Sequence, residues 1–281
     1  MNQPRRTFLK SALAASATAA LANPLHAAPA GAGKREYYEL RCYRLRAESR
    51  LQEDADAALL DRYLEQALLP ALDRRRIEPV GVFTELEVDH TALTATPKPG
   101  SPVWVLIPHA TLESYVEVAA SLVTDPQVQE AGAEYLNVSK ERPGFERIDS
   151  WLLLAFKSMP RIELPEFSKR RVPTRVFEMR DYESYSETKA LAKMAMFDDG
   201  ETELMRSLGM APVFFGQALS GPSLPHLRYI TSGPDLASHL ANWAKFGPDP
   251  RWQKMKDLPQ YADTVSRNTA RFLTPKPYSQ I

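Results

Sequence analysis

An internal repeat constrains this chain of 281 residues more than any other feature of its sequence. Residues 38–43 (Tyr-Glu-Leu-Arg-Cys-Tyr) align with residues 177–182 (Phe-Glu-Met-Arg-Asp-Tyr), 139 positions later. Both segments alternate apolar and polar side chains, which is the period of a β-strand. Residues 104–131 also align without gaps with residues 228–255, with six identities in 28 positions. The chain is therefore expected to fold as one structural unit repeated twice.

The repeat extends to the start of a helix in each half. Asp125-Pro126 and Asp249-Pro250 occupy matching positions of the aligned segments. Aspartate is a good helix N-cap, and proline fits the first helical position because its missing N–H would be unpaired there anyway. The same helix start is therefore predicted in both halves.

Each half is predicted to contain the order strand–helix–strand–strand–helix–strand. In the first half we expect strands at 37–45, 79–88, 102–107 and 151–157, with helices at 51–73 and from residue 112. In the second half we expect strands at 174–182, 213–219, 226–231 and 266–273, with helices at 184–209 and 235–246. Pro70 is expected to kink or restart the first helix, since proline cannot donate a helical hydrogen bond.

The predicted order βαββαβ is that of the ferredoxin-like fold. We therefore predict an α+β protein with two tandem ferredoxin-like repeats, packed sheet to sheet as an intramolecular dimeric α/β-barrel. The predicted boundaries are a first repeat at 35–157, a proline-flanked and charged linker at 158–173, and a second repeat at 174–281. Exposed sheet edges are the route by which we expect a homo-oligomer to form.

Short motifs in both halves are also shared with a known family. They include the two first-strand motifs, Leu-Pro-Ala-Leu at 69–72, Pro-Val-Gly-Val-Phe at 79–83, and the two Asp-Pro-x-x-Gln segments. Together they resemble the NIPSNAP family over residues 36–280, with one departure at Arg76, where glycine would be expected. The resemblance implies a dimeric α/β-barrel-like fold. It implies no established catalytic residues.

Residues 1–30 have the composition of an export signal, with three basic residues, no acidic residue and an alanine-rich stretch. That stretch is too short and too weakly apolar to span a bilayer. The run at 4–10 resembles the bacterial twin-arginine motif through Arg5, Arg6, Phe8 and Leu9. We predict export in the folded state by the twin-arginine machinery to the periplasm or extracellular space, an ordinary secretory signal being the alternative. Cleavage is expected after Ala22 or near Ala30.

The balance of charge limits the partners of the mature chain. Basic and acidic residues number 35 each, so no strong basic field is available for a nucleic-acid backbone. No later segment reaches about 18 consecutive apolar residues, so no membrane span is predicted. Cys42 is the only cysteine, which excludes an internal disulfide.

Two acidic clusters are expected to be structural. The segment at 198–203 holds four carboxylates, but its spacing does not match a calcium loop, and capping of a helix N-terminus explains it. Glu85, Glu87 and Asp89 share one face of a predicted strand, as expected of a solvated edge. We therefore predict no metal site.

Histidines supply the remaining candidates for acid–base or haem chemistry. His90, His109, His226 and His239 have no second ligand at helical spacing. His109 and His226 lie nearest to a predicted cleft, and a hydrogen-bonded structural role is the preferred interpretation for both. The sequence requires no cofactor.

The two first strands supply the candidate ligand-binding site. If their apolar side chains face the helices, six polar side chains face the barrel interior: Glu39, Arg41, Tyr43, Glu178, Arg180 and Tyr182. Arginine donors in such an interior could hold an anionic or polar aromatic ligand. The alternative is that each Glu–Arg pair only neutralises itself and joins the sheets.

These observations favour a non-catalytic small-molecule-binding or structural module, because no catalytic constellation is present in the sequence. The alternative is a small-barrel enzyme, either a cofactor-independent monooxygenase-like protein or a haem-handling protein. That alternative depends on analogy of fold, which is a weak argument for function.

Overall fold

The computed structural model describes residues 34–46 and 50–281. The export signal predicted at 1–30, with Arg5, Arg6, Phe8 and Leu9, lies outside the described residues. Within the described ranges, no helix combines the length and the apolar character needed to cross a membrane.

The first repeat supplies four strands of a barrel and the helices that cover them. The strands are β1 (Tyr37–Arg44), β2 (Gly81–Asp89), β4 (Val103–His109) and β5 (Arg147–Ala155), with an additional short strand β3 (Thr94–Pro97). The helices are α1 (Arg50–Tyr63), the π-helical turn η1 (Leu64–Leu68), α2 (Leu69–Asp73), α3 (Leu112–Ser121), the 3-10 turn η2 (Leu122–Thr124), α4 (Pro126–Ala131) and α5 (Ala133–Leu136).

The second repeat follows a connection over residues 156–175 that contains the short helix α6 (Glu166–Lys169). Its strands are β6 (Val176–Glu183), β7 (Pro212–Ser220), β8 (His226–Gly233) and β9 (Arg267–Pro275). Its helices are α7 (Glu187–Met196), the π-helical turn η3 (Phe197–Glu201), α8 (Thr202–Ser207), α9 (Leu236–Phe246), α10 (Pro250–Lys256) and the 3-10 turn η4 (Pro259–Tyr261).

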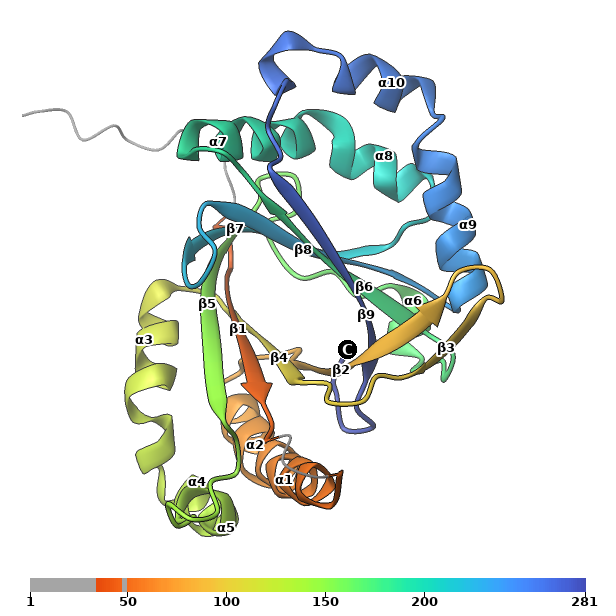
Figure 1. Ribbon diagram of the computed structural model, residues 1–281. Coiled ribbons are helices and arrows are strands. Elements are labelled where there is room, and N and C mark those ends of the chain that lie inside the picture. Colours follow the sequence, from red (N-terminus) through yellow and green to blue (C-terminus); the bar gives the residue numbers. More distant parts are fainter. Residues whose placement is uncertain (1–33, 47–49) are drawn as a thin grey trace, which may run out of the picture. The chain divides into compact units, whose positions relative to one another are not determined.

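Eight strands close into one antiparallel barrel (Figure 1). The sheet order is β3-β2-β4-β1-β5-β7-β8-β6-β9, and pairing of β2 with β9 closes the ring. Each half contributes four neighbouring strands in the ferredoxin-like order, β2-β4-β1-β5 from the first repeat and β7-β8-β6-β9 from the second. The predicted fold, two ferredoxin-like repeats packed as an intramolecular dimeric α/β-barrel, is confirmed.

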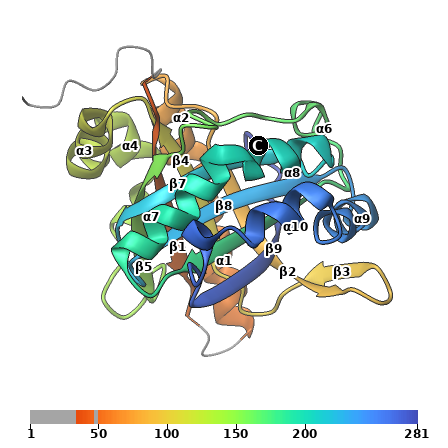
Figure 2. The same cartoon turned by 90° about the horizontal axis from the view of Figure 1, so that it is seen from above.

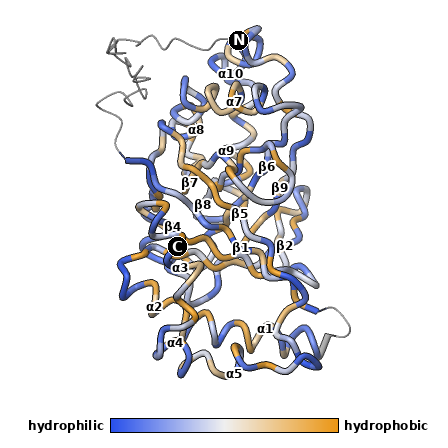
Figure 3. Tube along the Cα trace, turned by 90° about the vertical axis from the view of Figure 1, so that its left-hand side faces the viewer, coloured by the Kyte–Doolittle hydropathy of each residue, from blue (hydrophilic) through white to orange (hydrophobic). Residues whose placement is uncertain are grey.

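The helices cover the outside of the barrel in two groups, one for each repeat (Figures 1 and 3). The helices of the first repeat pack on β1, β2 and β4 through an apolar cluster that includes Leu60, Leu64, Leu68 and Val105. In the second repeat, α7, α8 and α9 pack on β7 and β8 around Phe197, Phe215 and Tyr229 (Figure 2). Both faces of β4 and β8 are therefore buried along their whole length.

A third apolar cluster fills one end of the barrel interior. It takes side chains from both sheets: Tyr38, Leu40, Leu106, Leu153, Phe177, Met179, Phe214, Ile230, Leu273 and the C-terminal Ile281 among others. An eight-stranded barrel is only wide enough to be filled by its own side chains, so this end is a packed core. The other end is lined by polar side chains, described below.

Both predicted Asp-Pro helix starts are present. The side chain of Asp125 accepts from the backbone N–H of Gln127, and that of Asp249 accepts from the N–H of Arg251. Pro70 lies in the first turn of α2, immediately after the π-helical turn η1, so the predicted restart of the first helix is present.

Closure of the barrel pairs the outer strands of the two sheets with each other, β5 with β7 and β2 with β9. In the described part of the chain this leaves β3, at the end of a hairpin with β2, as the unpaired edge (Figure 2). Oligomerisation through exposed sheet edges, as expected from the sequence, would therefore have to use β3.

Candidate functional site

The six polar side chains predicted to line the barrel interior lie on its outer face. Glu39, Arg41, Tyr43, Glu178, Arg180 and Tyr182 alternate with the interior residues Tyr38, Leu40, Cys42, Phe177 and Met179. The orientation expected from the sequence is therefore wrong. Because helices cover the outer face and the barrel core fills the inner one, the alternation alone could not tell which face was which.

The first of these sets forms an ion-paired cluster beneath the helices of the first repeat. Arg41 holds Glu39 with two hydrogen bonds, from Nε to Oε1 at 2.7 Å and from Nη2 to Oε2 at 2.8 Å. His109 Nε2 lies 3.8 Å from Glu39 Oε2, and Tyr43 packs into the apolar cluster there. Burial by itself raises the pKa of Glu39, but His109 and Arg41 together hold that pKa at about 2.

The second set forms a matching cluster beneath α9. Arg180 Nε donates to Glu178 Oε1 at 2.7 Å, and the buried His239 Nε2 lies 2.8 Å from Glu178 Oε2. The Arg180 guanidinium also stacks over the Trp243 ring at 3.7 Å. Tyr182 shares a hydrogen bond of 2.8 Å with the hydroxyl of Tyr229. The carboxylates of Glu39 and Glu178 thus each bind an arginine and lie near a histidine, which is the arrangement expected of a structural ion pair.

The low pKa of Glu39 predicts a specific acid dependence of stability. A carboxyl whose pKa is depressed on folding stabilises the protein above its unfolded pKa, and that contribution is lost as pH falls through the folded pKa. We therefore expect Glu39→Gln to be less stable than the parent at pH 7, with the difference shrinking from pH about 4.5 towards about 2.

Urea unfolding at several pH values would measure this difference. Glu141→Gln is the matched control, because Glu141 forms only an exposed pair of 3.8 Å with Lys140 and should show no such trend. A constant difference for Glu39→Gln across the acid range would contradict the expectation.

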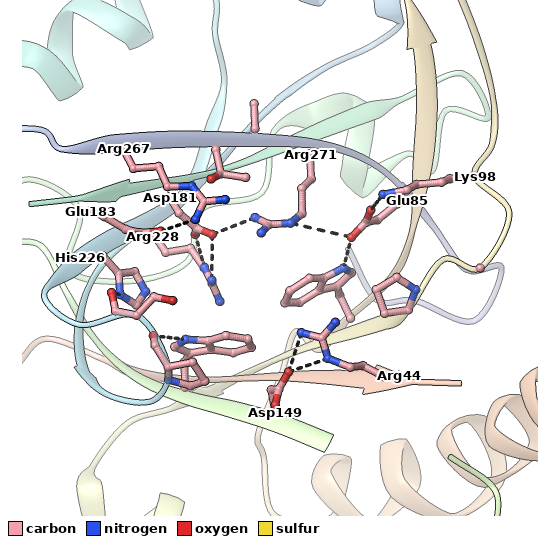
Figure 4. Close-up of a pocket in the computed structure, with 18 residues that line it drawn as sticks. Arg44, Glu85, Lys98, Asp149, Asp181, Glu183, His226, Arg228, Arg267 and Arg271 are labelled. Atoms are coloured by element: carbon pink, nitrogen blue, oxygen red, sulfur yellow. Dashed lines mark hydrogen bonds and ion pairs between the residues drawn. The ribbon is translucent and has the colours of Figure 1, made fainter. Parts of the chain in front are cut away.

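A cavity of about 570 Å³ opens at the polar end of the barrel (Figure 4). We call it the barrel mouth. It is lined at the carboxyl ends of β1 and β6, and at the amino ends of β4, β5, β8 and β9. Its charged side chains are the basic Arg44, Lys98, Arg228, Arg267 and Arg271 and the acidic Glu85, Asp149, Asp181 and Glu183.

Asp181 forms ion pairs with two arginines at the barrel mouth. Arg228 donates to both of its carboxylate oxygens, with Nη2 2.9 Å from Oδ2, and Arg271 Nη1 lies 2.8 Å from the same Oδ2. Burial alone would raise the pKa of Asp181, but the charges and hydrogen bonds of the two arginines hold it below its usual range. Asp181 therefore remains ionised and holds both guanidinium groups, which come from the neighbouring strands β8 and β9.

Two tryptophans from the first repeat form the opposite wall. The rings of Trp104 and Trp151 stack at 5.8 Å, and the Arg228 guanidinium lies 4.1 Å from the Trp151 ring. Trp151 Nε1 donates to the carbonyl of Pro222 at 3.0 Å. Gly221 has φ +124°, and a Cβ there would lie 2.5 Å from Trp151 Cδ1. Only glycine therefore allows this turn to pack against the tryptophan.

Glu85 differs from the expectation of a solvated edge. Its side chain faces the barrel mouth and is buried, bound by Lys98 Nζ at 2.5 Å and Trp104 Nε1 at 3.0 Å, while Glu87 and Asp89 on the same strand are exposed. The interpretation of Glu85 as a solvated residue was wrong because the first part of β2 belongs to the closed barrel and only its far end projects beyond it.

Two polar atoms at the barrel mouth have no hydrogen-bond partner in the described part of the chain. They are Nη1 of Arg228 and Nε2 of His226, and the two residues are 3% and 1% exposed. Nδ1 of His226 lies 3.0 Å from the carbonyl of Ser223, which can only accept, so Nδ1 carries the proton. Burial and the charge of Arg228 lower the pKa of His226, which leaves Nε2 as a free acceptor.

The acidic segment at 198–203 does not cap a helix N-terminus. Most of it forms η3 between α7 and α8, where Gly200 (φ +143°) interrupts the helical backbone, and neither η3 nor α8 has a side-chain capping hydrogen bond. Asp198 accepts from the N–H of Ser158, Asp199 from the hydroxyl of Tyr261, and Glu201 pairs with Lys193 inside the protein. Across residues 34–46 and 50–281, no three His, Cys, Asp or Glu side chains gather as a metal site would require.

Sequence reasoning missed most of the barrel mouth, although it named His226. One signal was present in the repeat itself. In the alignment of residues 38–43 with 177–182, Cys42 corresponds to Asp181. In the alignment of residues 104–131 with 228–255, Trp104 corresponds to Arg228. At both positions a charged side chain replaces one that suits a packed core, and both positions face inward.

Comparisons with known proteins find solved structures that resemble most of this chain and a family model that matches the second repeat. A crystal structure described as a candidate monooxygenase from Lactobacillus acidophilus matches with a TM-score of 0.52 and 9% identity, over 86% of this chain and 94% of that one. A mutant chlorite dismutase from Candidatus Nitrospira defluvii matches with a TM-score of 0.41 and 6% identity, over 88% of this chain and 93% of that one.

A NIPSNAP-like domain protein from Burkholderia xenovorans matches 38% of this chain and 89% of its own length, with 18% identity and a TM-score of 0.34. A search of curated proteins finds no match. Residues 177–280, from β6 almost to the C-terminus, match the NIPSNAP family model.

Proposed function

We propose that this protein is a small-barrel binding module that holds a small molecule at the barrel mouth without transforming it. One observation carries the proposal: His226 and Arg228 line the same cavity, and Arg228 Nη1 and His226 Nε2 are buried and lack a partner in the described chain. Leaving a buried polar group unpaired costs about 1–3 kcal/mol, and more for a charged one. A bound ligand that pairs with both atoms would recover that cost.

The electrostatics of the barrel mouth favour a ligand with an oxygen acceptor. Each of its acidic side chains already faces a basic partner: Lys98 for Glu85, Arg44 for Asp149, Arg228 for Asp181 and Arg267 for Glu183. The unpaired Nη1 of Arg228 belongs to a cationic group, and basic side chains lining the cavity outnumber acidic ones by one when His226 is neutral. A small neutral or singly negative molecule fits this balance better than a cation.

The size of the cavity is also that of a small-molecule site. Its volume of about 570 Å³ falls within the range of about 300–1,000 Å³ typical of such sites. The packed core at the other end of the barrel closes the cavity from below, so the ligand would enter and leave at the polar end.

An enzyme of the small-barrel type, monooxygenase-like and independent of a cofactor, is the second candidate. The observation that favours it is the free Nε2 of His226, because a neutral imidazole with an open acceptor can take a proton. The sequence also supports the proposal that the protein acts in the periplasm or outside the cell, exported folded through the twin-arginine machinery.

Replacement of Arg228 by lysine tests the binding function. Lysine keeps a positive charge opposite Asp181 but loses the free guanidinium N–H. Because a hydrogen bond to a charged group is worth about 1.5–3 kcal/mol, we expect affinity for the natural ligand to fall about 10- to 100-fold. The measurement is untargeted mass spectrometry of small molecules that co-purify with the native protein, followed by thermal melts with and without that extract.

Arg267→Lys is the matched control, because Arg267 lines the same mouth but its side chain is 70% exposed and its nearest ion pair is 4.0 Å long. We expect this variant to retain the ligand. If the parent protein retains no small molecule and the extract leaves its melting temperature unchanged, the proposed binding function is wrong.

A further inference from the structure

His226 and Arg228 present their unpartnered atoms from the same face of one strand. Both residues belong to β8, and because they are two positions apart their side chains leave the strand on the same, inward side. Two residues along a strand span about 6.6 Å, so the two side chains leave the backbone at neighbouring points of the same cavity wall. Figure 4 shows both side chains directed into the cavity, on the side where Asp181 and Glu183 also lie.

The two free atoms make complementary demands on a ligand. Arg228 Nη1 is a donor and needs an acceptor, whereas His226 Nε2 is an acceptor and needs a donor. A carboxylate would pair with Arg228 but would leave Nε2 facing an oxygen lone pair. A single hydroxyl group satisfies both, since its oxygen accepts from Arg228 while its proton is donated to His226.

We infer that the ligand carries a weakly acidic hydroxyl, as in a phenol or an enol, and that His226 takes its proton while Arg228 holds the resulting oxyanion. The inference rests on the proposed binding function and names its ligand class. In this step the O–H bond breaks, its electron pair stays on the oxygen, and a new N–H bond forms at Nε2. No oxidant, reductant or metal is needed, and the ligand is bound as its anion beside an imidazolium.

The groups that face His226 keep it unprotonated before binding, while Asp181 and the Ser223 carbonyl favour its protonated form. Burial, Arg228 and Arg271 keep the imidazole neutral before the ligand arrives, while Asp181 acts in the opposite direction and Glu183 lines the same cavity. A base must be unprotonated to act, so this arrangement keeps Nε2 ready. After the transfer, the positive charge on His226 lies next to the negative charge of the ligand oxyanion. The imidazole and the hydroxyl were both neutral before the transfer, so the net charge of the cavity does not change.

The hydrogen bond between Nδ1 of His226 and the carbonyl of Ser223 holds the ring in the required form. Because that carbonyl accepts the Nδ1 proton at 3.0 Å, the tautomer with a free Nε2 is the one present. The same contact would stabilise the imidazolium once Nε2 is protonated. Ser223 therefore positions the ring for its role as an acceptor.

The test uses 4-nitrophenol as the probe, because its phenol and phenolate forms absorb at different wavelengths. At a pH where the free probe is mainly phenol, we expect the parent protein to bind it as phenolate. In His226→Gln, which can form a hydrogen bond but cannot accept a proton, we expect the probe to bind as phenol, with the apparent pKa of the bound probe at least one unit higher. His90→Gln, at an exposed position outside the cavity, should behave as the parent does.

Three results would overturn the inference. The parent could bind the probe as phenol, His226→Gln could bind it as phenolate, or the parent could fail to bind it at all. In each case the proposed binding function is judged separately, by whether a co-purifying molecule is retained and depends on Arg228. A thermal melt of His226→Gln confirms that the variant is folded before its spectrum is interpreted.

Discussion

Replacing Lys193 with methionine is expected to destabilise the folded protein by about 3–5 kcal/mol, because breaking one partner of a buried ion pair leaves the other charge unpaired. Lys193 Nζ lies 2.7 Å from Glu201 Oε2, and the two side chains are 5% and 1% exposed. The ammonium group also lies over the rings of Phe197 and Trp252, at 4.8 and 5.2 Å. The methionine would fill similar space, so the loss would be mainly electrostatic.

Urea unfolding at pH 7 measures this effect. The double variant Lys193→Met/Glu201→Gln should recover much of the lost stability, because it removes both charges. The pKa of Glu201 is already raised by burial, despite the opposing charge of Lys193. When folding raises the pKa of a carboxyl group, the free energy of unfolding falls as pH rises, because the buried group must then ionise. The loss of stability caused by Lys193→Met should therefore be larger at pH 8 than at pH 5.

The control is Lys169→Met, which removes an exposed pair of 2.7 Å with Glu166 and should cost no more than about 1 kcal/mol. If Lys193→Met unfolds at the same urea concentration as Lys169→Met, then the buried pair contributes little and the expectation is wrong.

Replacing Asp181 with asparagine is expected to change stability and ligand retention in opposite directions. The variant leaves Arg228 and Arg271 without their shared counter-charge at a position that is 5% exposed. We expect a loss of about 3 kcal/mol, at the lower end for a buried pair because the barrel mouth is open to water on one side. The cavity then has five basic and three acidic side chains, so an anionic ligand should bind about tenfold more tightly.

Unfolding in urea and thermal melts with the co-purified small-molecule extract measure the two effects on the same preparation. Glu183→Gln is the matched control, because it removes a carboxylate from the same cavity whose side chain is 27% exposed and 4.0 Å from Arg267. Its stability should change little. A simultaneous loss of stability and of ligand retention in Asp181→Asn would show that Asp181 contributes to binding as well as to folding.

The fold could be predicted because several local signals agreed with one another. The repeat at 38–43 and 177–182 predicted two equivalent first strands, and β1 and β6 do occupy equivalent places in the two sheets. Asp125 and Asp249 predicted equivalent helix starts for a local reason, since the capping hydrogen bond involves only the next two residues. Strand β3 was missed because it is short, exposed and stabilised only by its hairpin with β2.

The site could not be predicted in the same way, because the residues that form it are brought together by barrel closure. Asp181, Arg228 and Arg271 come from three strands, and the tryptophans facing them come from the other repeat. Nothing in the alternation of β1 or β6 distinguishes a face covered by helices from a face that forms a barrel core. The six residues proposed from the sequence were therefore assigned to the wrong face, and their role in ligand binding remains a prediction.

The sequence by itself determined the period of each element, the order of the elements and the duplication, because each of these depends on neighbours along the chain. Only the tertiary structure decided which face of each strand lies inside. It also decided which charged residues meet at the barrel mouth and which of their atoms lack a partner. The reason is physical: pairing and burial of a side chain such as Arg228 depend on Asp181 and Trp151, which are distant along the chain and adjacent only when the barrel is closed.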